Sequence, residues 1–186
     1  MPKVNSVAIK FRPPEVRSAR RLSKSVDVDA SVEEIWKAWT TEPGARTFFA
    51  PAARIELSIG GRYEPLFDED APEGLQGGEG LQVLSYLPHR MLSFTWNAPP
   101  QYPTIRAKYH AWVVLQFDPL PGKRTRVHLD HLGWGKGGGW NEVFTYFDKA
   151  WDLVLWRLAK RFDEGPIDWK DPYRPPKGWS ASVRRR

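Results

Sequence analysis

Short stretches in which hydrophobic and polar residues alternate recur along the chain, and this period of two is typical of half-buried β-strands. The first is SVDVDA, where Val26 and Val28 alternate with aspartates. Later stretches of the same kind are RIELSI, RYEPLF, GLQVLSYL, MLSFTW, the run from Tyr109 to Phe117, and TRVHLDHLGW. Glycine pairs and a Pro88-His89 turn separate neighbouring stretches, which favours antiparallel hairpins.

Two parts of the chain carry the helical period instead. After the first strand, Ser31 and Glu34 form a capping box that predicts a short helix, and a second, broken helical stretch ends at Phe49. Residues 140–162 predict one long helix, whose apolar positions step by three and four: Trp140, Phe144, Phe147, Trp151, Val154, Leu155, Leu158 and Phe162. One long helix is available to cover an antiparallel sheet, so the expected class is α+β.

The positive charge of the chain lies at its two ends. The net charge is +6 over 186 residues, with a pI of about 9.6. Residues 1–24 carry +6 and residues 166–186 carry +4, which leaves −4 for the segment between them. A nucleic-acid-binding fold places its basic residues on the folded surface together with recognisable motifs, and none is present here. We therefore expect no specific nucleic-acid partner.

This charge pattern divides the chain into three parts. We expect a basic N-terminal arm over residues 1–23, a folded domain over 24–165, and a proline-rich basic tail over 166–186. The arm is expected to be mobile or to lie across the domain. The tail contains three aromatic residues, so part of it is expected to pack back on the domain: Trp169, Tyr173 and Trp179.

Several classes of protein are disfavoured by residue types. The chain has no cysteine, which removes disulfides, thiolate metal sites and cysteine nucleophiles. The four histidines show no zinc-binding spacing, so neither a metal nor a cofactor is expected. No apolar run is long enough to span a membrane, and no leader pattern is visible at the N-terminus. The expected location is cytoplasmic.

Six segments occur in an order and spacing typical of one family: ASVEEIWKAWT, FFAP, SIGGRYEPLF, RMLSFTW, VHLDHLGWG and AWDLVLWRLAKRF. They resemble the activator of heat-shock-protein-90 ATPase homologues, within the START-like (SRPBCC, Bet v 1-like) superfamily. The resemblance covers roughly residues 24–163 and neither end of the chain. ATPase activation is not carried over, because the eukaryotic cochaperone uses a separate N-terminal domain for which this chain has no room.

The resemblance implies a helix-grip fold. In it a seven-stranded antiparallel sheet wraps around a long C-terminal helix, with two short helices after the first strand and an internal pocket between sheet and helix. Members of the superfamily hold lipids or other apolar molecules there, and a minority catalyse reactions. Because aromatic side chains combine apolar area with polar handles, the aromatic residues expected near the pocket are its candidate ligand contacts: Tyr63, Trp96, Tyr109, Trp134, Phe144, Phe147 and Trp151.

His131 is the remaining candidate for ligand contact. It shares strand parity with Val127 and Leu129, which places it on the inner face, whereas His110 and His128 have the opposite parity and are expected on the outer face. A neutral imidazole there could bond a ligand or act as a base. Asp130 cannot orient the ring, since adjacent strand residues point to opposite faces.

The sequence therefore favours a non-catalytic protein that binds a hydrophobic small molecule or lipid between the sheet and the long helix. Two alternatives stay open. One is a chaperone-associated interaction module that uses the outer surface, and the other is a hydrolase or cyclase that uses His131 and a tyrosine in the same pocket. No catalytic residue is assigned.

Overall fold

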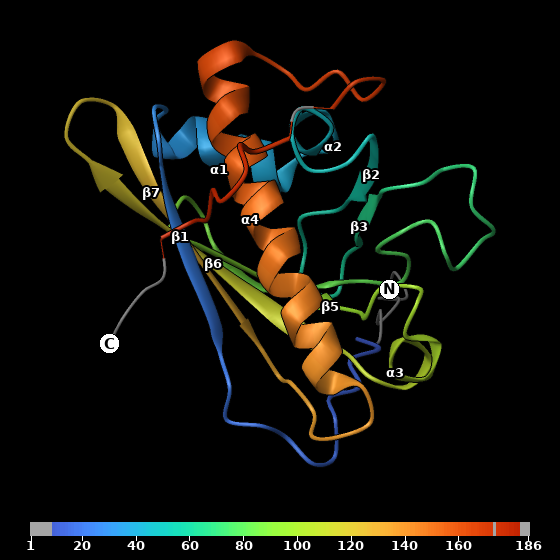
Figure 1. Ribbon diagram of the computed structural model, residues 1–186. Coiled ribbons are helices and arrows are strands. Elements are labelled where there is room, and N and C mark those ends of the chain that lie inside the picture. Colours follow the sequence, from blue (N-terminus) through green and yellow to red (C-terminus); the bar gives the residue numbers. More distant parts are fainter. Residues whose placement is uncertain (1–8, 173, 183–186) are drawn as a thin grey trace, which may run out of the picture.

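Seven antiparallel strands in two sheets form the frame of the computed structural model, which describes residues 9–172 and 174–182. The main sheet holds, in spatial order, β1 (Leu22–Val28), β7 (Arg124–Leu132), β6 (Ala111–Leu120), β5 (Met91–Trp96) and β4 (Val83–Leu87). A smaller sheet consists of β2 (Ala52–Ile55) and β3 (Tyr63–Leu66). The long helix α4 (Trp140–Glu164) lies across the main sheet (Figure 1).

The expected α+β helix-grip fold is confirmed, with a correction to the single seven-stranded sheet. The segments that lead into β3 and β4 pair through an isolated bridge between Arg62 and Gln82, and β3 and β4 are not paired with each other. Backbone hydrogen bonds at 2.9 Å flank that bridge: Tyr63 N–H donates to the Leu81 carbonyl, Val83 N–H donates to the Gly61 carbonyl, and Gly60 N–H donates to the Val83 carbonyl. The alternating stretch RIELSI also ends early, because a tight turn begins at Glu56. Ile59, the last apolar residue of that stretch, is 66% exposed as a result.

Within the described residues, three short helices accompany α4. The capping box of α1 (Val32–Thr40) is present, with the Ser31 side chain and the Glu34 backbone joined as expected, and α2 (Glu42–Ala45) follows it. Helix α3 (Pro103–Lys108) was not predicted, because its six residues bury only Ile105 and show no apolar period. The side chains of α1 and of the inner sheet face pack against α4 to form the core.

The alternation in β6 and β7 produces the inner face of the sheet. Val113, Leu115, Val127 and Leu129 are completely buried there. Burying each such aliphatic side chain contributes roughly 1.5–3 kcal/mol relative to leaving it exposed. The inner face of these strands is thus fixed by the sequence pattern itself, and it presents His131 to α4.

The described part of the N-terminal arm lies across the outer face of the sheet. His110 N–H donates to the Arg12 carbonyl at 2.7 Å, and the Phe11 ring contacts the edge of Trp112 at a centroid distance of 5.6 Å. His110 and His128 have the outward parity that was expected, but both are buried rather than exposed. His110 is buried because the arm covers it. The first part of the arm, residues 1–8, lies outside the described residues.

The C-terminal tail packs back on the domain, as expected. Ile167 is buried and donates its N–H to the Thr47 carbonyl at 2.9 Å, and the Trp169 indole donates to the Arg46 carbonyl at 2.6 Å. Trp179 packs against the core, while Tyr173 lies outside the described residues.

A buried ion pair joins β1 to α4. The Lys24 ammonium group, 2% exposed, lies 2.7 Å from Asp152 and 2.8 Å from Asp148. Asp152 also accepts the backbone N–H of Ala181, so the same carboxylate holds the returning tail.

In the part of the chain that the structure describes, no helix is both long and apolar enough to cross a membrane.

Candidate functional site

An apolar cleft of about 240 Å³ runs along the flank of α4, and we call it the α4 groove. Its walls come from α4, from the end of β5, and from the segments that follow α2 and β3. Its lining residues are Phe49, Phe67, Trp96, Tyr146, Phe147, Ala150, Trp151, Leu153, Val154 and Arg157. Apart from Arg157 and the hydroxyl and indole groups, this lining is hydrocarbon, which suits an apolar ligand.

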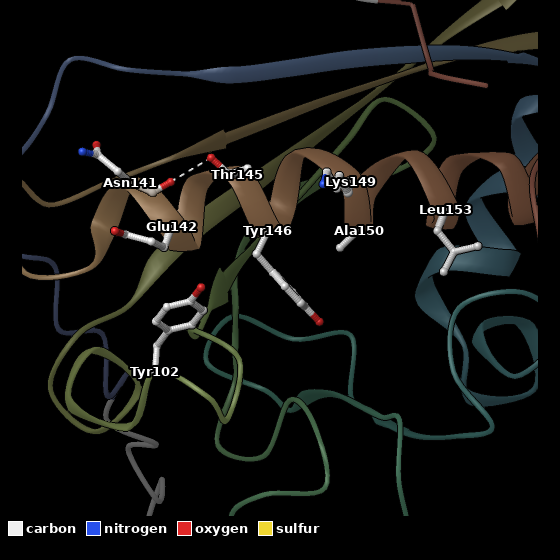
Figure 2. Close-up of a pocket in the computed structure, with 8 residues that line it drawn as sticks. All are labelled: Tyr102, Asn141, Glu142, Thr145, Tyr146, Lys149, Ala150 and Leu153. Atoms are coloured by element: carbon white, nitrogen blue, oxygen red, sulfur yellow. Dashed lines mark hydrogen bonds between the residues drawn. The ribbon is translucent and has the colours of Figure 1, made fainter. Parts of the chain in front are cut away.

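Two further clefts adjoin the α4 groove and share residues with it. One, also about 240 Å³, shares Phe67, Trp96, Tyr146 and Phe147 and extends the groove towards the 68–80 loop. The other is a wider, open depression of about 840 Å³ that shares Tyr146, Ala150 and Leu153. Figure 2 shows these side chains on one side of α4, with Tyr102 facing them from the opposite wall.

Two parallel stripes on α4 explain why the groove lies on its flank. Phe147, Trp151, Val154 and Leu158 form the buried stripe that packs into the core. A second stripe lines the groove, and each of its residues directly precedes a residue of the buried stripe in the sequence: Tyr146, Ala150, Leu153 and Arg157. Since helical neighbours are three and four residues apart, the second stripe continues along the edge of the first.

Aromatic rings form the floor of the groove. The Trp96 and Trp151 centroids are 5.0 Å apart, and Trp96 stacks on Phe49 at 5.9 Å. The buried Trp96 indole N–H has no hydrogen-bond partner among the described residues. Tyr146 supplies a polar handle at the rim, where burial raises the pKa of its hydroxyl and keeps it a neutral donor.

His131 lies beneath this floor rather than in the groove. It is completely buried, and its Nδ1 accepts the Trp151 indole N–H at 3.0 Å. The Trp134 and Phe147 rings surround it at centroid distances of 4.1 and 5.0 Å. Around His131, the space between the sheet and α4, where the sequence predicted a cavity, is therefore occupied by rings.

The predicted ligand contacts divide into two groups. Trp96, Phe147 and Trp151 line the α4 groove. The others line neither the groove nor its two adjoining clefts: Tyr63, Tyr109, His131, Trp134 and Phe144.

Each residue of the second group has structural partners. The Tyr63 hydroxyl donates to the Trp39 carbonyl at 3.0 Å, and Trp134 donates its indole N–H to the His131 carbonyl at 2.8 Å. Phe144 packs on Trp134 at 4.9 Å. Tyr109 contacts Trp140 beside a separate cleft at the arm.

Arg106 of α3 holds the loop that forms the outer wall of the clefts. Its guanidinium donates to the carbonyls of Gly77 at 2.7 Å, Gly74 at 2.8 Å and Ala98 at 2.8 Å, and Glu79 lies 3.6 Å away. These contacts connect the 68–80 loop to the segment after β5. No pattern in the sequence indicates this arrangement, because the hydrogen-bond partners of Arg106 are backbone carbonyls.

Burial of His131 in the core and of His110 beneath the N-terminal arm makes stability depend on pH. Burial lowers the pKa of His131 well below its usual value, and burial followed by the charge of Arg12 lowers the pKa of His110. Below a pH of about 6.5 the unfolded chain binds protons that the folded chain excludes, so stability is lost as the pH falls.

We therefore expect the free energy of unfolding to decrease by up to about 1.4 kcal/mol per pH unit for His131 alone as the pH falls below about 6.5. In the variant His131→Gln, which keeps an acceptor for the Trp151 indole, that part of the slope should disappear. Urea unfolding at several pH values between about 5 and 7.5 measures it. If the free energy of unfolding has the same pH dependence in both proteins, His131 is protonated to the same extent in the folded and the unfolded chain.

The comparisons with known proteins agree with this fold. The family described as Activator of Hsp90 ATPase homolog 1-like protein matches residues 29–163. A comparison with the curated proteins found no match.

Solved structures with the same fold are only distantly similar in sequence. The Aha1 dimer from Colwellia psychrerythraea has 16% identity and a TM-score of 0.60, over 78% of this chain and 98% of that one. A protein from Mesorhizobium loti has 18% identity and a TM-score of 0.63, over 80% and 100%. CalU16 from Micromonospora echinospora has 19% identity and a TM-score of 0.57, over 82% and 83%. At these identities the similarity concerns the fold alone.

Proposed function

The chain belongs to the family of Activator of Hsp90 ATPase homolog 1-like proteins, and from this premise we propose that it binds a small hydrophobic molecule in the α4 groove without catalysing a reaction. One observation carries the proposal. The buried aromatic floor of the groove continues into large apolar side chains that remain exposed, Phe67 at 45% and Tyr146 at 41% in the groove and Leu75 at 44% in the adjoining cleft. A ligand that covers them gains roughly 25 cal/mol for each Å² of apolar surface removed from water.

The size of the site favours a small molecule. The α4 groove and the adjoining cleft that shares four of its residues are each about 240 Å³. Their summed volume lies within the range of small-molecule sites, roughly 300–1,000 Å³. Two other exposed apolar residues, Ile59 and Leu87, do not line the groove. The chaperone-associated alternative stays a prediction.

The positions of His131 and Tyr63 favour binding over catalysis. Both side chains are completely buried and hydrogen-bonded within the core, at Trp151 and Trp39 respectively. A general base must come within hydrogen-bond reach of its substrate, directly or through one water molecule. Neither side chain lines the groove, so a hydrolase or cyclase that uses them would require a rearranged core.

Titration with Nile red, a neutral apolar dye, tests the proposal. We expect saturable fluorescence enhancement with the wild-type protein, and about threefold or more weaker binding by Phe67→Ala, since truncation removes apolar contact area from the ligand. Leu87→Ala is the matched control, because Leu87 is 57% exposed but lies outside the groove. Equal loss in both variants, or no saturable binding at all, would contradict the proposal.

A further inference from the structure

Another cleft, of about 390 Å³, lies where the N-terminal arm meets α3, and we call it the basic cleft. Its lining residues are Lys10, Arg12, Gly74, Leu75, Glu79, Gly80, Asn97, Pro100, Pro103, Arg106, Ala107 and His110. The cations come from two distant parts of the sequence, the arm and α3. They meet because His110 N–H donates to the Arg12 carbonyl and fixes the arm against the sheet.

The cleft carries an excess of positive charge. Lys10 and Arg12 are exposed and form no ion pair with another described residue, while Arg106 is anchored mainly by backbone carbonyls, which do not neutralise it. Glu79 is the acidic residue of the lining, and backbone N–H groups of Gly74 and Gly77 already occupy its carboxylate. With His110 neutral, the three cations exceed the single carboxylate by two charges.

His110 adds a buried polar atom to the same lining. Its side chain is 93% removed from solvent, and its Nδ1 has no hydrogen-bond partner among the described residues. Unsatisfied buried polar atoms are uncommon in folded proteins and are often completed by a bound molecule or water. The basic cleft therefore places an excess of positive charge beside a buried imidazole nitrogen that has no partner among the described residues.

The basic cleft is continuous with the clefts of the proposed binding site. It shares Leu75, Asn97, Pro100 and Arg106 with the cleft that extends the α4 groove along the 68–80 loop. That cleft in turn shares Phe67, Trp96, Tyr146 and Phe147 with the groove itself. An apolar end and a cationic end are thus joined through one row of lining residues, with Arg106 at the junction.

We infer that the ligand of this site is an amphipathic anion, whose hydrocarbon part lies in the α4 groove and whose phosphate or carboxylate head lies in the basic cleft beside Lys10, Arg12 and Arg106. This inference rests on the proposed function and specifies its ligand class. Anionic oxygens bonded by lysine and arginine form charge-assisted hydrogen bonds, which are stronger than neutral ones. The cations also increase the rate at which an anion reaches the cleft.

Isothermal titration with decyl phosphate, decan-1-ol and inorganic phosphate tests the inference, with decyl phosphate below its micellar concentration and decan-1-ol below its solubility limit. We expect decyl phosphate to bind the wild-type protein about tenfold or more tightly than decan-1-ol, because only the phosphate uses the cations. The advantage should shrink as salt is raised. Inorganic phosphate should bind more weakly than decyl phosphate, since it lacks the chain.

The variant Lys10→Gln with Arg12→Gln removes two exposed cations and no buried contact. It should bind decyl phosphate no better than decan-1-ol, with decan-1-ol binding unchanged. The control pair Arg90→Gln and Lys123→Gln removes the same charge from exposed turns outside the cleft and should keep the phosphate preference.

Three outcomes would overturn the inference in different ways. Equal affinity for decyl phosphate and decan-1-ol in the wild-type protein would show that an anionic head does not contribute to binding, and it would leave the proposed binding in the groove uncontradicted. Equal affinity for inorganic phosphate and decyl phosphate would show that the head alone binds and the two clefts act separately. Absence of binding by both decyl compounds would contradict the proposed function itself.

Discussion

Replacing Lys24 with alanine is expected to lower the free energy of unfolding by about 3 kcal/mol. The Lys24 ammonium group is buried between β1 and α4, where it lies within 3 Å of Asp152 and Asp148. Removing it leaves the Asp152 carboxylate, only 16% exposed, without its cation in a partly dehydrated site. It also weakens the attachment of the tail, because Asp152 holds the backbone of Ala181.

Urea unfolding of the variant beside Lys37→Ala measures this effect. Lys37 forms the same type of ion pair with Glu33, but both side chains are more than 60% exposed, so its loss should cost less than about 0.5 kcal/mol. The double variant Lys24→Ala with Asp152→Asn should recover part of the loss, since it removes the uncompensated charge. A loss for Lys24→Ala no larger than that for Lys37→Ala would show that the buried pair does not contribute to stability.

Replacing Ala150 with tryptophan is expected to weaken Nile red binding at least tenfold while leaving the fold intact. Ala150 is partly buried and lines both the α4 groove and the wider depression beside it. An indole placed there occupies much of a 240 Å³ groove, so the ligand loses its contact with the floor. Nile red titration, together with the thermal unfolding midpoint, separates lost binding from lost structure.

Ala150→Ser is the matched control, because it changes the same position with almost no change in volume. Leu153→Trp provides a second obstruction from the next turn of α4 in case Ala150→Trp is poorly folded. Undiminished dye binding by both folded tryptophan variants would place the ligand elsewhere on the protein.

The sequence was sufficient to predict most of the fold, since its signals are local. Val113, Leu115, Val127 and Leu129 alternate on neighbouring strands, and the structure buries all four on one face. The division of the strands into two sheets was missed because it depends on a turn near Glu56 and on the spacing of backbone bridges. Hydrophobic alternation contains no information about either.

The candidate site was less predictable, because a groove depends on what lies beside the core. Trp96 and Trp151 were identified from their aromatic character near the pocket that the resemblance implies, and both line the α4 groove. Trp134 satisfied the same criteria, yet it fills the core beside His131. The stripe at Tyr146, Ala150 and Leu153 could have been recognised from its three- and four-residue spacing next to the buried stripe.

The basic cleft could not be derived from sequence at all. Arg12 and Arg106 are 94 positions apart, and they line one cleft only because the arm lies across the outer face of the sheet beside His110. The charge excess of residues 1–24 was visible in the sequence, but its position relative to the groove was not. Tertiary contacts by backbone atoms determine where the arm lies, and therefore where its charge lies relative to the groove.

Native mass spectrometry of freshly purified protein tests the central claim most directly, with the wild-type chain and Ala150→Trp compared under identical conditions. We predict a species heavier than the 21.4 kDa chain by the mass of one small amphipathic molecule, present for the wild-type protein and depleted in the variant. An equal population of that species in both proteins, with Ala150→Trp folded, would contradict binding in the α4 groove.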